Sequence, residues 1–359
     1  MLAIGDVPFH ELRRELRQAL SEYVHVPHME SYDDLHRATG YLIGRHGRID
    51  RIDSLTEHWL PFEARLREDF NVFGLHPSQV ARLRSKSAMA EIFKATDVPA
   101  PALERASSPD QVRAFAQRRG LPLIIKPDIG VGAAGAFKVG TPTQLEAALA
   151  MPLTDMVVQE FVQAKITSFD GLTDSRGEIA FCTSFSYSSG IMEVVSDQLD
   201  VYYWSRRAIP PMLEEYGQRT VAAFGLKERF FHIEFFELPD GTFRALEVNL
   251  RPPGGFTTDL MNWSCDTDVY RLWAGVVSGA PIEGFAYERR YHAAHISRRR
   301  GRRYKRSHHA IVEYLGGAML EYRELAPPIS VAMGDRIYLV RFPQMSHLEQ
   351  AVRFINEME

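Results

Sequence analysis

The segment FFHIEFFELPDGTFRALEVNLRPPGG, residues 230–255, contains two acidic residues inside otherwise apolar runs. Aromatic and branched residues predict a strand at each end, and the Pro-Asp-Gly at 239–241 predicts the turn between them. Glu234 belongs to the first strand and Glu247 to the second. The segment therefore predicts a hairpin in which each strand carries one carboxylate.

The second strand of this hairpin places three polar side chains on one face. Alternation puts Glu247, Asn249 and Arg251 on the same side. Together with Glu234, two carboxylates and an amide oxygen are hard ligands of the kind that Mg²⁺ prefers, and they leave positions open for phosphate oxygens. Arg251 offers a planar guanidinium to a second anion. The alternative is a hairpin whose polar residues form only its solvent-exposed face.

A loop of small residues lies in the segment LPLIIKPDIGVGAAGAFKV, residues 121–139. Lys126 ends a strand pattern, and Gly130, Gly132 and Gly135 follow with two alanines among them. Small residues let backbone amides approach a polyphosphate closely. A second strand pattern follows, so the Walker and Rossmann loops, which open a helix, are excluded. A hairpin tip that closes over phosphates fits this pattern, and a purely structural hairpin is the alternative.

Two further segments flank this loop. SKSAMAEIFKATDVPAPA, residues 85–102, predicts a helix capped by Ser85 that ends before a turn at 97–99. Lys86 lies in its first turn, where a cation opposes the helix dipole, which suggests an anionic partner. Taken alone, a solvated lysine is the more common explanation. Residues 156–162 predict an apolar strand with the carboxylate of Glu160 near its end.

Taken in order, these residues resemble the ATP-grasp superfamily. Lys86, on a helix, resembles its first nucleotide-binding lysine, and Lys126 resembles the strand lysine before the glycine-rich loop. Glu160-Phe161-Val162 resembles the hinge that binds the adenine edge. His232-Ile233-Glu234 and the run from Glu247 to Arg251 resemble the paired metal-binding strands and the arginine that follows them.

The resemblance covers roughly residues 85–280 and, within the superfamily, is to carboxylate–amine ligases, including those that join amino acids. It implies an α/β ATP-grasp fold with a small N-terminal parallel α/β domain, a glycine-loop lid and a mixed-sheet core for metal and nucleotide. The implied divisions are an N-terminal domain, a lid subdomain with its linker helix, a core with the metal strands and a C-terminal subdomain, at residues 1–84, 85–158, 159–285 and 286–359.

The resemblance also implies ATP and Mg²⁺, with Mn²⁺ as a substitute, and a reaction that activates a carboxylate as an acyl phosphate before an amine attacks it. Carboxylation, thioester formation and a non-catalytic nucleotide-binding module are the alternatives. The implied nucleotide contacts are Lys86, Lys126, Gly130, Gly132, Gly135, Glu160, Phe161 and Val162. The implied metal ligands are Glu234, Glu247 and Asn249, and Arg251 is the implied catalytic residue.

The chain departs from the family pattern after the hinge. Many relatives carry a ribose-binding carboxylate where this sequence has Ile166 or Thr167. The ribose contacts are therefore left open, with Thr167 or Asp170 as weak substitutes. His232 beside Glu234 is expected to be a buried, hydrogen-bonded histidine rather than a metal ligand.

Composition bounds the remaining possibilities. A chain of 359 residues that is 45% hydrophobic suffices for two or three domains. A net charge of −4 does not favour nucleic acid as a partner. The two cysteines, Cys182 and Cys265, lack metal-type spacing and predict neither a metal site nor a disulfide. Without an 18-residue apolar run or a signal-peptide pattern, we expect a cytoplasmic enzyme of small-molecule substrates that does not bind membranes. A homodimer is left open.

The flanking regions alternate short strand and helix patterns. Residues 1–80 predict a small parallel sheet, from strands at 23–29 and 49–53 and helices at 9–20, 32–47 and 57–70. Glu57, His58 and Glu63 either reach the substrate site or lie on a helix surface. Other helices are expected at 141–150, 211–226, 268–279 and 346–357, with a strand at 336–342. The basic run 297–309 is interpreted as a solvated loop or a wall of an anionic-substrate site, in preference to a patch that binds nucleic acid or an acidic partner.

Overall fold

The computed structural model describes residues 1–130, 135–188, 190, 198–280, 282, 285–327 and 329–359. The chain forms two compact units, Met1–Ala81 and Arg82–Glu359. Both cysteines, Cys182 and Cys265, are buried and free, as their number and spacing predict. In the described ranges, no helix is long and apolar enough to cross a membrane.

The first unit contains the predicted small parallel sheet. Its two strands are β1 (Leu2–Gly5) and β2 (Glu22–His25). Its helices are η1 (Phe9–Glu11), α1 (Arg14–Ala19), α2 (Tyr32–His46), α3 (Leu60–Asp69) and α4 (Pro77–Arg84), the last of which crosses the unit boundary. The helices expected at 32–47 and 57–70 are therefore confirmed. Strand β1 is absent from the sequence-based prediction.

The continuous helix expected over residues 9–20 is wrong. The backbone is extended at Leu12 and Arg13, with ψ of 147° and 143°, so a 3-10 helix and a short α-helix replace it. Neither piece contains a buried residue. Most helical stability in proteins comes from packing an apolar face, and this segment gains little of it.

The strand expected at 49–53 is also wrong, because this segment pairs with a side chain. The carbonyl of Ile52 accepts a hydrogen bond from Arg67 Nε at 3.0 Å. Arg67 is buried, and its Nη2 also bonds Glu63 Oε2 at 2.8 Å. Glu63 therefore lies neither on a helix surface nor free for a substrate, because its carboxylate neutralises a buried guanidinium.

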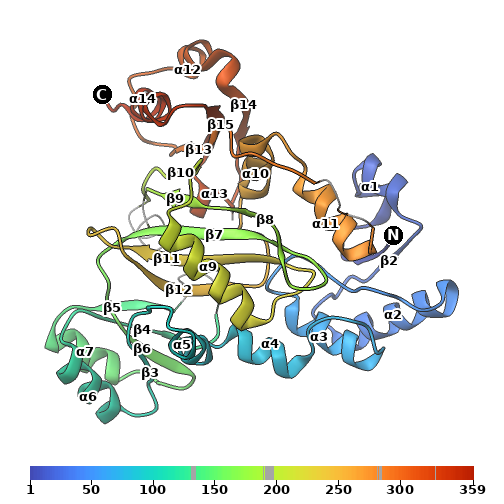
Figure 1. Cartoon of the computed structure of the whole chain (residues 1–359), viewed down its shortest axis with the longest axis horizontal. Coiled ribbons are helices and arrows are strands. Elements are labelled where there is room, and N and C mark those ends of the chain that lie inside the picture. Colours follow the sequence, from blue (N-terminus) through green and yellow to red (C-terminus); the bar gives the residue numbers. More distant parts are fainter. Residues whose placement is uncertain (131–134, 189, 191–197, 281, 283–284, 328) are drawn as a thin grey trace. The chain divides into compact units, whose positions relative to one another are not determined.

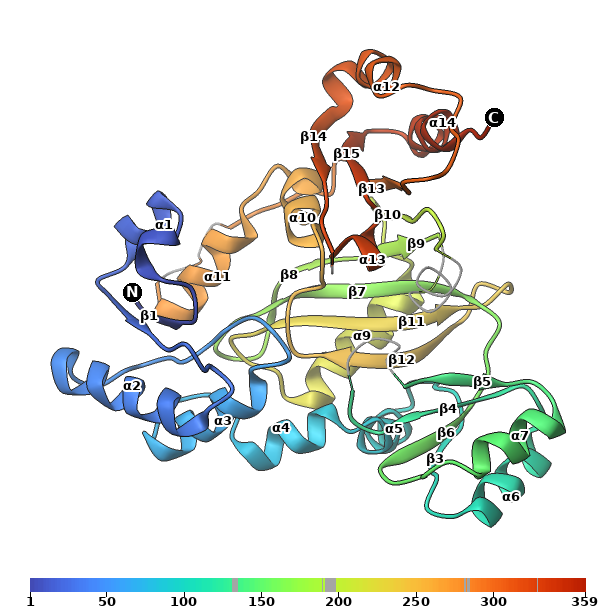
Figure 2. The same ribbon diagram turned by 180° about the vertical axis from the view of Figure 1, so that it is seen from behind.

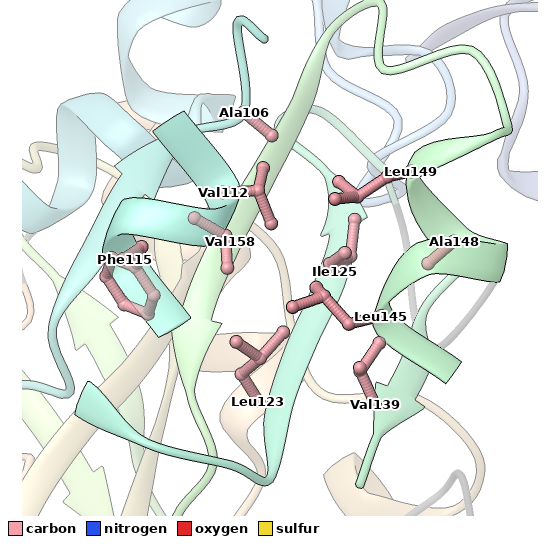
Figure 3. Close-up of a cluster of buried hydrophobic side chains, with 10 residues drawn as sticks. All are labelled: Ala106, Val112, Phe115, Leu123, Ile125, Val139, Leu145, Ala148, Leu149 and Val158. Carbon is pink, nitrogen blue, oxygen red and sulfur yellow. The ribbon is translucent and has the colours of Figure 1, made fainter. Parts of the chain in front are cut away.

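The second unit begins with α5 (Lys86–Ala95) and a four-stranded antiparallel sheet in the order β3-β6-β4-β5. The strands are β3 (Leu103–Arg105), β4 (Leu123–Pro127), β5 (Phe137–Val139) and β6 (Met156–Glu160). Helices α6 (Pro109–Arg119) and α7 (Pro142–Leu149) cover one face, α7 with the predicted Thr141 cap. The core between them consists of Ala106, Val112, Phe115, Leu123, Ile125, Val139, Leu145, Ala148, Leu149 and Val158 (Figure 3).

A nine-stranded antiparallel sheet forms the centre of this unit (Figure 1). Its order is β12-β11-β7-β9-β10-β13-β15-β14, with β8 also paired to β7. The strands are β7 (Lys165–Thr173), β8 (Ile179–Thr183), β9 (Phe185–Tyr187), β10 (Tyr202–Ser205), β11 (Phe230–Glu237), β12 (Phe243–Asn249), β13 (His292–Arg298), β14 (Met319–Glu324) and β15 (Arg336–Phe342). Strands β13 to β15 continue the sheet that holds the predicted metal strands. The finer divisions after residues 158 and 285 stay predictions.

Helix α9 (Pro211–Phe224) lies across β7 and buries the apolar face of the sheet (Figure 1). The close approach requires Gly217, since a Cβ there would lie 2.2 Å from a ring carbon of Phe169. Phe169 itself is fully buried and stacks on Phe231. One face of the central sheet is therefore apolar and covered, which leaves the other face for polar groups.

Two further groups of helices complete the unit. Helices α10 (Thr257–Cys265) and α11 (Val269–Ser278) follow β12, and α10 contacts β13. At the C-terminal end, α12 (His308–Leu315), η2 (Gly316–Ala318), α13 (Ile329–Met333) and α14 (Met345–Asn356) accompany β13 to β15 (Figure 2). The helices expected at 268–279 and 346–357 and the strand at 336–342 are confirmed.

The basic run 297–309 is mostly the connection between β13 and α12, and its side chains contact neighbouring parts of the same unit. Arg298 donates to the carbonyl of Ile355 at 2.7 Å, and Tyr304 donates to Asp200 at 2.7 Å. Lys305 lies 2.7 Å from a carboxylate oxygen of Glu357. Much of the run's charge is paired within the fold, because carboxylate oxygens lie within 3.3 Å of Arg300, Arg302, Arg303, Lys305 and Arg306.

Candidate active site

The two acidic residues of the hairpin face each other across a strand pair. Glu234 on β11 is directly opposite Glu247 on β12, and His232 is opposite Asn249. Residues opposite each other in an antiparallel pair project on the same face, so the three predicted metal ligands share the polar face of the sheet. Like charges in this position destabilise a sheet, and the arrangement therefore needs cations nearby.

Lys86 supplies one of these cations. It is the first residue of α5, follows the Ser85 cap as predicted, and is 5% exposed. Its Nζ lies 3.7 Å from Glu247 Oε1 and donates to the carbonyl of Gly130 at 3.2 Å. One lysine thus joins the start of a helix, the beginning of the small-residue loop and a metal strand.

Lys126 is the second cation and lies at the end of β4, as expected. Burial, and to a lesser extent the neighbouring charge of Lys86, lower the pKa of Lys126 to about 8, against the opposing pull of Glu247 and Glu234. Lys86, Glu234 and Glu247 therefore all interact electrostatically with Lys126, although the four residues come from four different segments. A lysine poised to titrate near neutral pH gains most from an anion that restores its charge.

Arg251 lies just beyond the end of β12 rather than within it. Its Nη2 is 3.4 Å from Asn249 Oδ1, and its Nη1 donates to the carbonyl of Pro252 at 3.0 Å. The guanidinium thus remains beside Asn249 even though strand alternation ends before it. Asn249 is buried, and its Nδ2 donates to the carbonyl of His232 at 3.5 Å.

Asp128 anchors the start of α5 and escapes sequence reasoning. Its carboxylate accepts hydrogen bonds from the Ser87 amide at 2.7 Å and the Ser85 hydroxyl at 2.8 Å, while its carbonyl accepts from the Lys86 amide at 3.0 Å. This buried aspartate fixes Lys86 relative to β4. The partners are more than 40 residues apart in sequence, so no local pattern identifies them.

His232 is buried and hydrogen-bonded, as expected. Its Nδ1 lies 2.5 Å from Asp170 Oδ1, and its Nε2 lies 3.4 Å from Glu234 Oε1. Burial alone would lower the pKa of His232, but Asp170 and Glu234 outweigh it and raise the pKa to about 9. Burial would likewise raise the pKa of Glu234, but His232 and then Arg251 hold it below its usual range. Glu234 is therefore an anion that can coordinate a cation.

The predicted hinge connects the two sheets of the unit. Strand β6 ends at Glu160, whose Oε2 accepts from the Ala102 amide at 3.2 Å and whose Oε1 lies 3.2 Å from Arg244. Phe161 and Val162 are half-buried, and the Nζ of Lys138 lies 3.7 Å above the ring of Phe161. An adenine contact at this hinge stays a prediction.

The glycine loop is described at its two ends. Gly130 accepts from Lys86, and Gly135 has a φ of +72°, a left-handed conformation that favours glycine. Gly132 lies outside the described residues. The strands on both sides, β4 and β5, are antiparallel partners, so the predicted hairpin is confirmed and its contact with phosphates stays a prediction.

The two residues expected to replace the ribose carboxylate are both committed elsewhere. Thr167 is fully buried, and its hydroxyl donates to the carbonyl of Phe185 at 2.8 Å. Asp170 is fully buried as well and is bonded to His232 and Ser168. The expectation that Thr167 or Asp170 replaces the ribose-binding carboxylate is therefore wrong, because neither side chain reaches the surface.

The donor set fits a magnesium ion that shares its coordination with phosphates. Glu234, Glu247 and Asn249 offer two carboxylates and an amide oxygen on one face. Within the described ranges, no three His, Cys, Asp or Glu side chains group as a metal centre. Mg²⁺ is typically bound through one or two carboxylates together with substrate phosphates rather than by a protein cage, which agrees with this set.

Two cavities lie away from this face. One of about 420 Å³ is lined by residues that include Ser107 and Thr154, and one of about 690 Å³ by residues that include Arg207 and Arg289. Neither lining contains Glu234 or any other predicted site residue. The chemistry of the polar face, rather than cavity size, therefore locates the candidate site.

Comparison of sequences gives partial matches. No protein-family model matches the chain. An uncharacterized protein, y4rH, of Sinorhizobium fredii is 27% identical over 100 residues, which are 26% of this chain and 21% of that protein. The carbamoyl phosphate synthase large chain, C-terminal section, of Methanopyrus kandleri is 25% identical over 160 residues, 43% of this chain and 28% of that one. The chain thus matches less than a third of the length of either relative.

Solved structures match along almost the whole chain. An L-amino acid ligase from Bacillus licheniformis has a TM-score of 0.74 at 16% identity, covering 98% of this chain and 95% of that one. An N5-carboxyaminoimidazole synthetase from Staphylococcus aureus complexed with ADP has a TM-score of 0.70 at 14% identity, with coverages of 97% and 88%.

A third similar structure is the biotin carboxylase domain of the Hydrogenobacter thermophilus 2-oxoglutarate carboxylase, in complex with MgADP, ADP and bicarbonate. Its TM-score is 0.62 at 13% identity, with coverages of 95% and 86%. These likenesses show that the chain has the ATP-grasp fold, in agreement with the family resemblance of its motifs.

Proposed function

We propose that this chain is an ATP- and Mg²⁺-dependent ligase that activates a carboxylate as an acyl phosphate and joins it to an amine, with amino acids or peptides as substrates. The observation that carries the proposal is the pairing of Glu234 with Glu247 beside Lys86 and Lys126. Two carboxylates face each other with two lysines in electrostatic reach, which suits a polyphosphate held together with a divalent cation. The similar structures with ADP and MgADP support the same ligands.

In the proposed reaction, the protein positions groups and neutralises charge. Lys86 and Lys126 bind phosphate oxygens of ATP. Glu234, Glu247 and Asn249 hold Mg²⁺, which supplies charge neutralisation to the transferring phosphoryl group.

Arg251 lies beside Asn249, where its guanidinium binds the acceptor carboxylate or the charge that builds up on the acyl phosphate. The carboxylate oxygen attacks the γ-phosphorus and ADP leaves. The amine then attacks the acyl carbon and phosphate leaves. The amine enters as a neutral nucleophile, so one proton is released in this step.

Carboxylation is the second candidate function. It is favoured by the similar N5-carboxyaminoimidazole synthetase and by the biotin carboxylase domain with its bound bicarbonate. In that reaction, bicarbonate takes the place of the organic carboxylate and carboxyphosphate is the activated species. The phosphate-binding and metal-binding groups would do the same work, so Glu234 and Glu247 do not distinguish the two reactions.

The two candidates are separated by phosphate release from ATP over a panel of single amino acids and amino-acid pairs, with and without added bicarbonate. We expect release that depends on amino acids and not on bicarbonate, with Glu247→Gln as the inactive control. Release that requires bicarbonate supports carboxylation. Nucleotide binding without release under any condition supports a non-catalytic module.

A labelled carboxylate tests the acyl phosphate directly. When the substrate carboxylate carries ¹⁸O, one labelled oxygen passes to phosphate as the amine displaces it. Mass spectrometry of the released phosphate is expected to show this transfer during full turnover. Unlabelled phosphate in an active reaction would exclude the acyl phosphate route.

A further inference from the structure

Two rows of polar side chains cross the metal-binding face of the central sheet. In both rows, each side chain is directly opposite the next on the neighbouring strand, so all of them project on the same side. The first row runs through Asn249, His232, Asp170 and Thr183, and the second through Glu247, Glu234 and Ser168. The predicted metal ligands are therefore the edge of a polar network that continues inward onto β7 and β8.

Asp170 is the innermost charged member of this network. It is 0% exposed, so its carboxylate is removed from water and depends on partners inside the protein. One oxygen lies 2.5 Å from His232 Nδ1, and the other accepts from the Ser168 hydroxyl at 2.5 Å. Both oxygens are thus held, and the direction of the carboxylate is fixed by the strand pair.

His232 transmits this fixed direction to the metal strand. Because its Nδ1 is bound to Asp170, the ring orientation is set, and Nε2 points to Glu234 Oε1 at 3.4 Å. This contact engages one oxygen of Glu234 and leaves the other available to a cation. Histidine and carboxylate partners of this kind orient metal ligands in many proteins.

We propose that Asp170 is a positioning residue that acts through His232 to hold Glu234 in its metal-binding orientation. The inference rests on the proposed function, because it takes Glu234 as a ligand of Mg²⁺. Asp170 does not touch the ion or any substrate. Its contribution is to restrict the carboxylate of Glu234 before the ion arrives, which lowers the entropic cost of coordination.

A purely structural role is the competing explanation, and the chain offers a matched control for it. Asp174 follows the same strand, is buried at 8% exposure and accepts hydrogen bonds from the amides of Arg176 and Glu178. Its partners lie outside the two polar rows. Asp170→Asn and Asp174→Asn therefore each remove the charge of one buried aspartate, but only the first touches the network that reaches Glu234.

The test measures binding rather than turnover. Mn²⁺ replaces Mg²⁺ as the probe, and its free concentration is followed by electron paramagnetic resonance in the presence of saturating ADP and full-length protein. ADP binding is measured separately by calorimetry without divalent cations. We expect Asp170→Asn to raise the Kd for Mn²⁺ by about 10- to 100-fold, the range typical for loss of such a partner, and Asp174→Asn to leave it unchanged. ADP binding without the metal stays within about twofold of wild type in both variants.

A second variant keeps the inference open to refutation if Asp170→Asn does not fold, as checked by circular dichroism. His232→Gln breaks the same connection at its middle residue and is expected to raise the Kd for Mn²⁺ over the same range. If both variants fold, the double variant should bind Mn²⁺ no more weakly than the weaker single variant, because the two residues act in series.

Three results would overturn the positioning role: a Kd for Mn²⁺ in the folded variant within threefold of wild type, an equal loss in Asp174→Asn, or an equal loss of metal-free ADP binding. Failure of the proposed metal site is recognised differently. If Glu234→Gln binds Mn²⁺ as tightly as wild type, then Glu234 is not a ligand, whatever Asp170 does.

Discussion

Nucleotide binding is expected to weaken as the pH rises above 8, because Lys126 loses its charge in that range. Burial and the charge of Lys86 lower the pKa of Lys126 to about 8 in the nucleotide-free protein. The sign follows from the depressed pKa: Lys126 is a cation below pH 8 and neutral above it. A phosphate that binds the charged form raises this pKa again, so binding takes up a proton.

The magnitude follows from the charged fraction. With a pKa near 8, that fraction is about 0.9 at pH 7, about 0.5 at pH 8 and about 0.1 at pH 9. If only the charged form binds phosphate, the apparent Kd rises by about 10-fold between pH 7 and pH 9. Proton uptake on binding should rise over the same interval from about 0.1 to about 0.9 per nucleotide.

Calorimetry of ADP binding in buffers of different ionisation enthalpy measures both quantities. Lys126→Arg keeps its charge throughout and is expected to lose the pH dependence while retaining affinity at pH 7. Lys126→Met should bind about 10- to 150-fold more weakly at pH 7, since a charge-assisted contact is worth about 1.5–3 kcal/mol. His232, with a pKa near 9, titrates in the same interval in all three proteins. Its contribution to the pH dependence therefore cancels when the three proteins are compared. Parallel pH profiles for wild type and Lys126→Arg would refute the reasoning.

Three further substitutions test the site and the sheet beneath it. Glu247→Gln is expected to abolish ATP turnover, because it removes a proposed metal ligand, while the circular dichroism melt stays cooperative; turnover at the wild-type rate would exclude Glu247 as a ligand. Asp128→Ala should cost about 1.5–3 kcal/mol of unfolding free energy in urea, since it removes charge-assisted bonds at the start of α5, and should weaken ADP binding through Lys86. An unchanged urea midpoint would contradict this. Gly217→Ala should destabilise by about 1–3 kcal/mol, because its Cβ would overlap Phe169, and a melting temperature equal to wild type would show that α9 shifts freely.

The parts of the site that sequence alone predicts are those governed by local patterns. The two predicted metal strands follow from aromatic alternation, and the turn between them follows from the Pro-Asp-Gly at 239–241. The pairing of Glu234 with Glu247 does not, because a register shift between Glu234 and Phe235 produces it. The start of α5 follows from the Ser85 cap, which accepts from the Ala88 amide as the pattern predicts. These features depend on residues only a few positions apart.

The features that sequence reasoning misses depend on distant residues. Asp170 and His232 are 62 positions apart, and Asp128 meets Ser85 across 43. Neither aspartate stands out within its own segment, because a single carboxylate in a strand or after a Lys-Pro is consistent with a solvent-exposed side chain. The prediction of a strand at 49–53 fails for the same reason. The buried Arg67 of α3 donates to the carbonyl of Ile52, which a neighbouring strand would otherwise bind.

Burial favours the ligand-binding interpretation of the acidic hairpin over the solvent-exposed one. A merely solvent-exposed polar face would leave its side chains hydrated, yet Asn249 is 4% exposed and the side chain of Glu247 only 13%. Taking such groups out of water is costly, and placing Glu234 opposite Glu247 adds repulsion that an apolar pair would avoid. Lys86 relieves part of this repulsion and is itself buried at 5% exposure, so its own desolvation adds to the cost. Folding alone does not require this concentration of buried charge. A bound polyphosphate with its cation would pair these charges, which is why the site is better explained by its ligand than by the stability of the sheet.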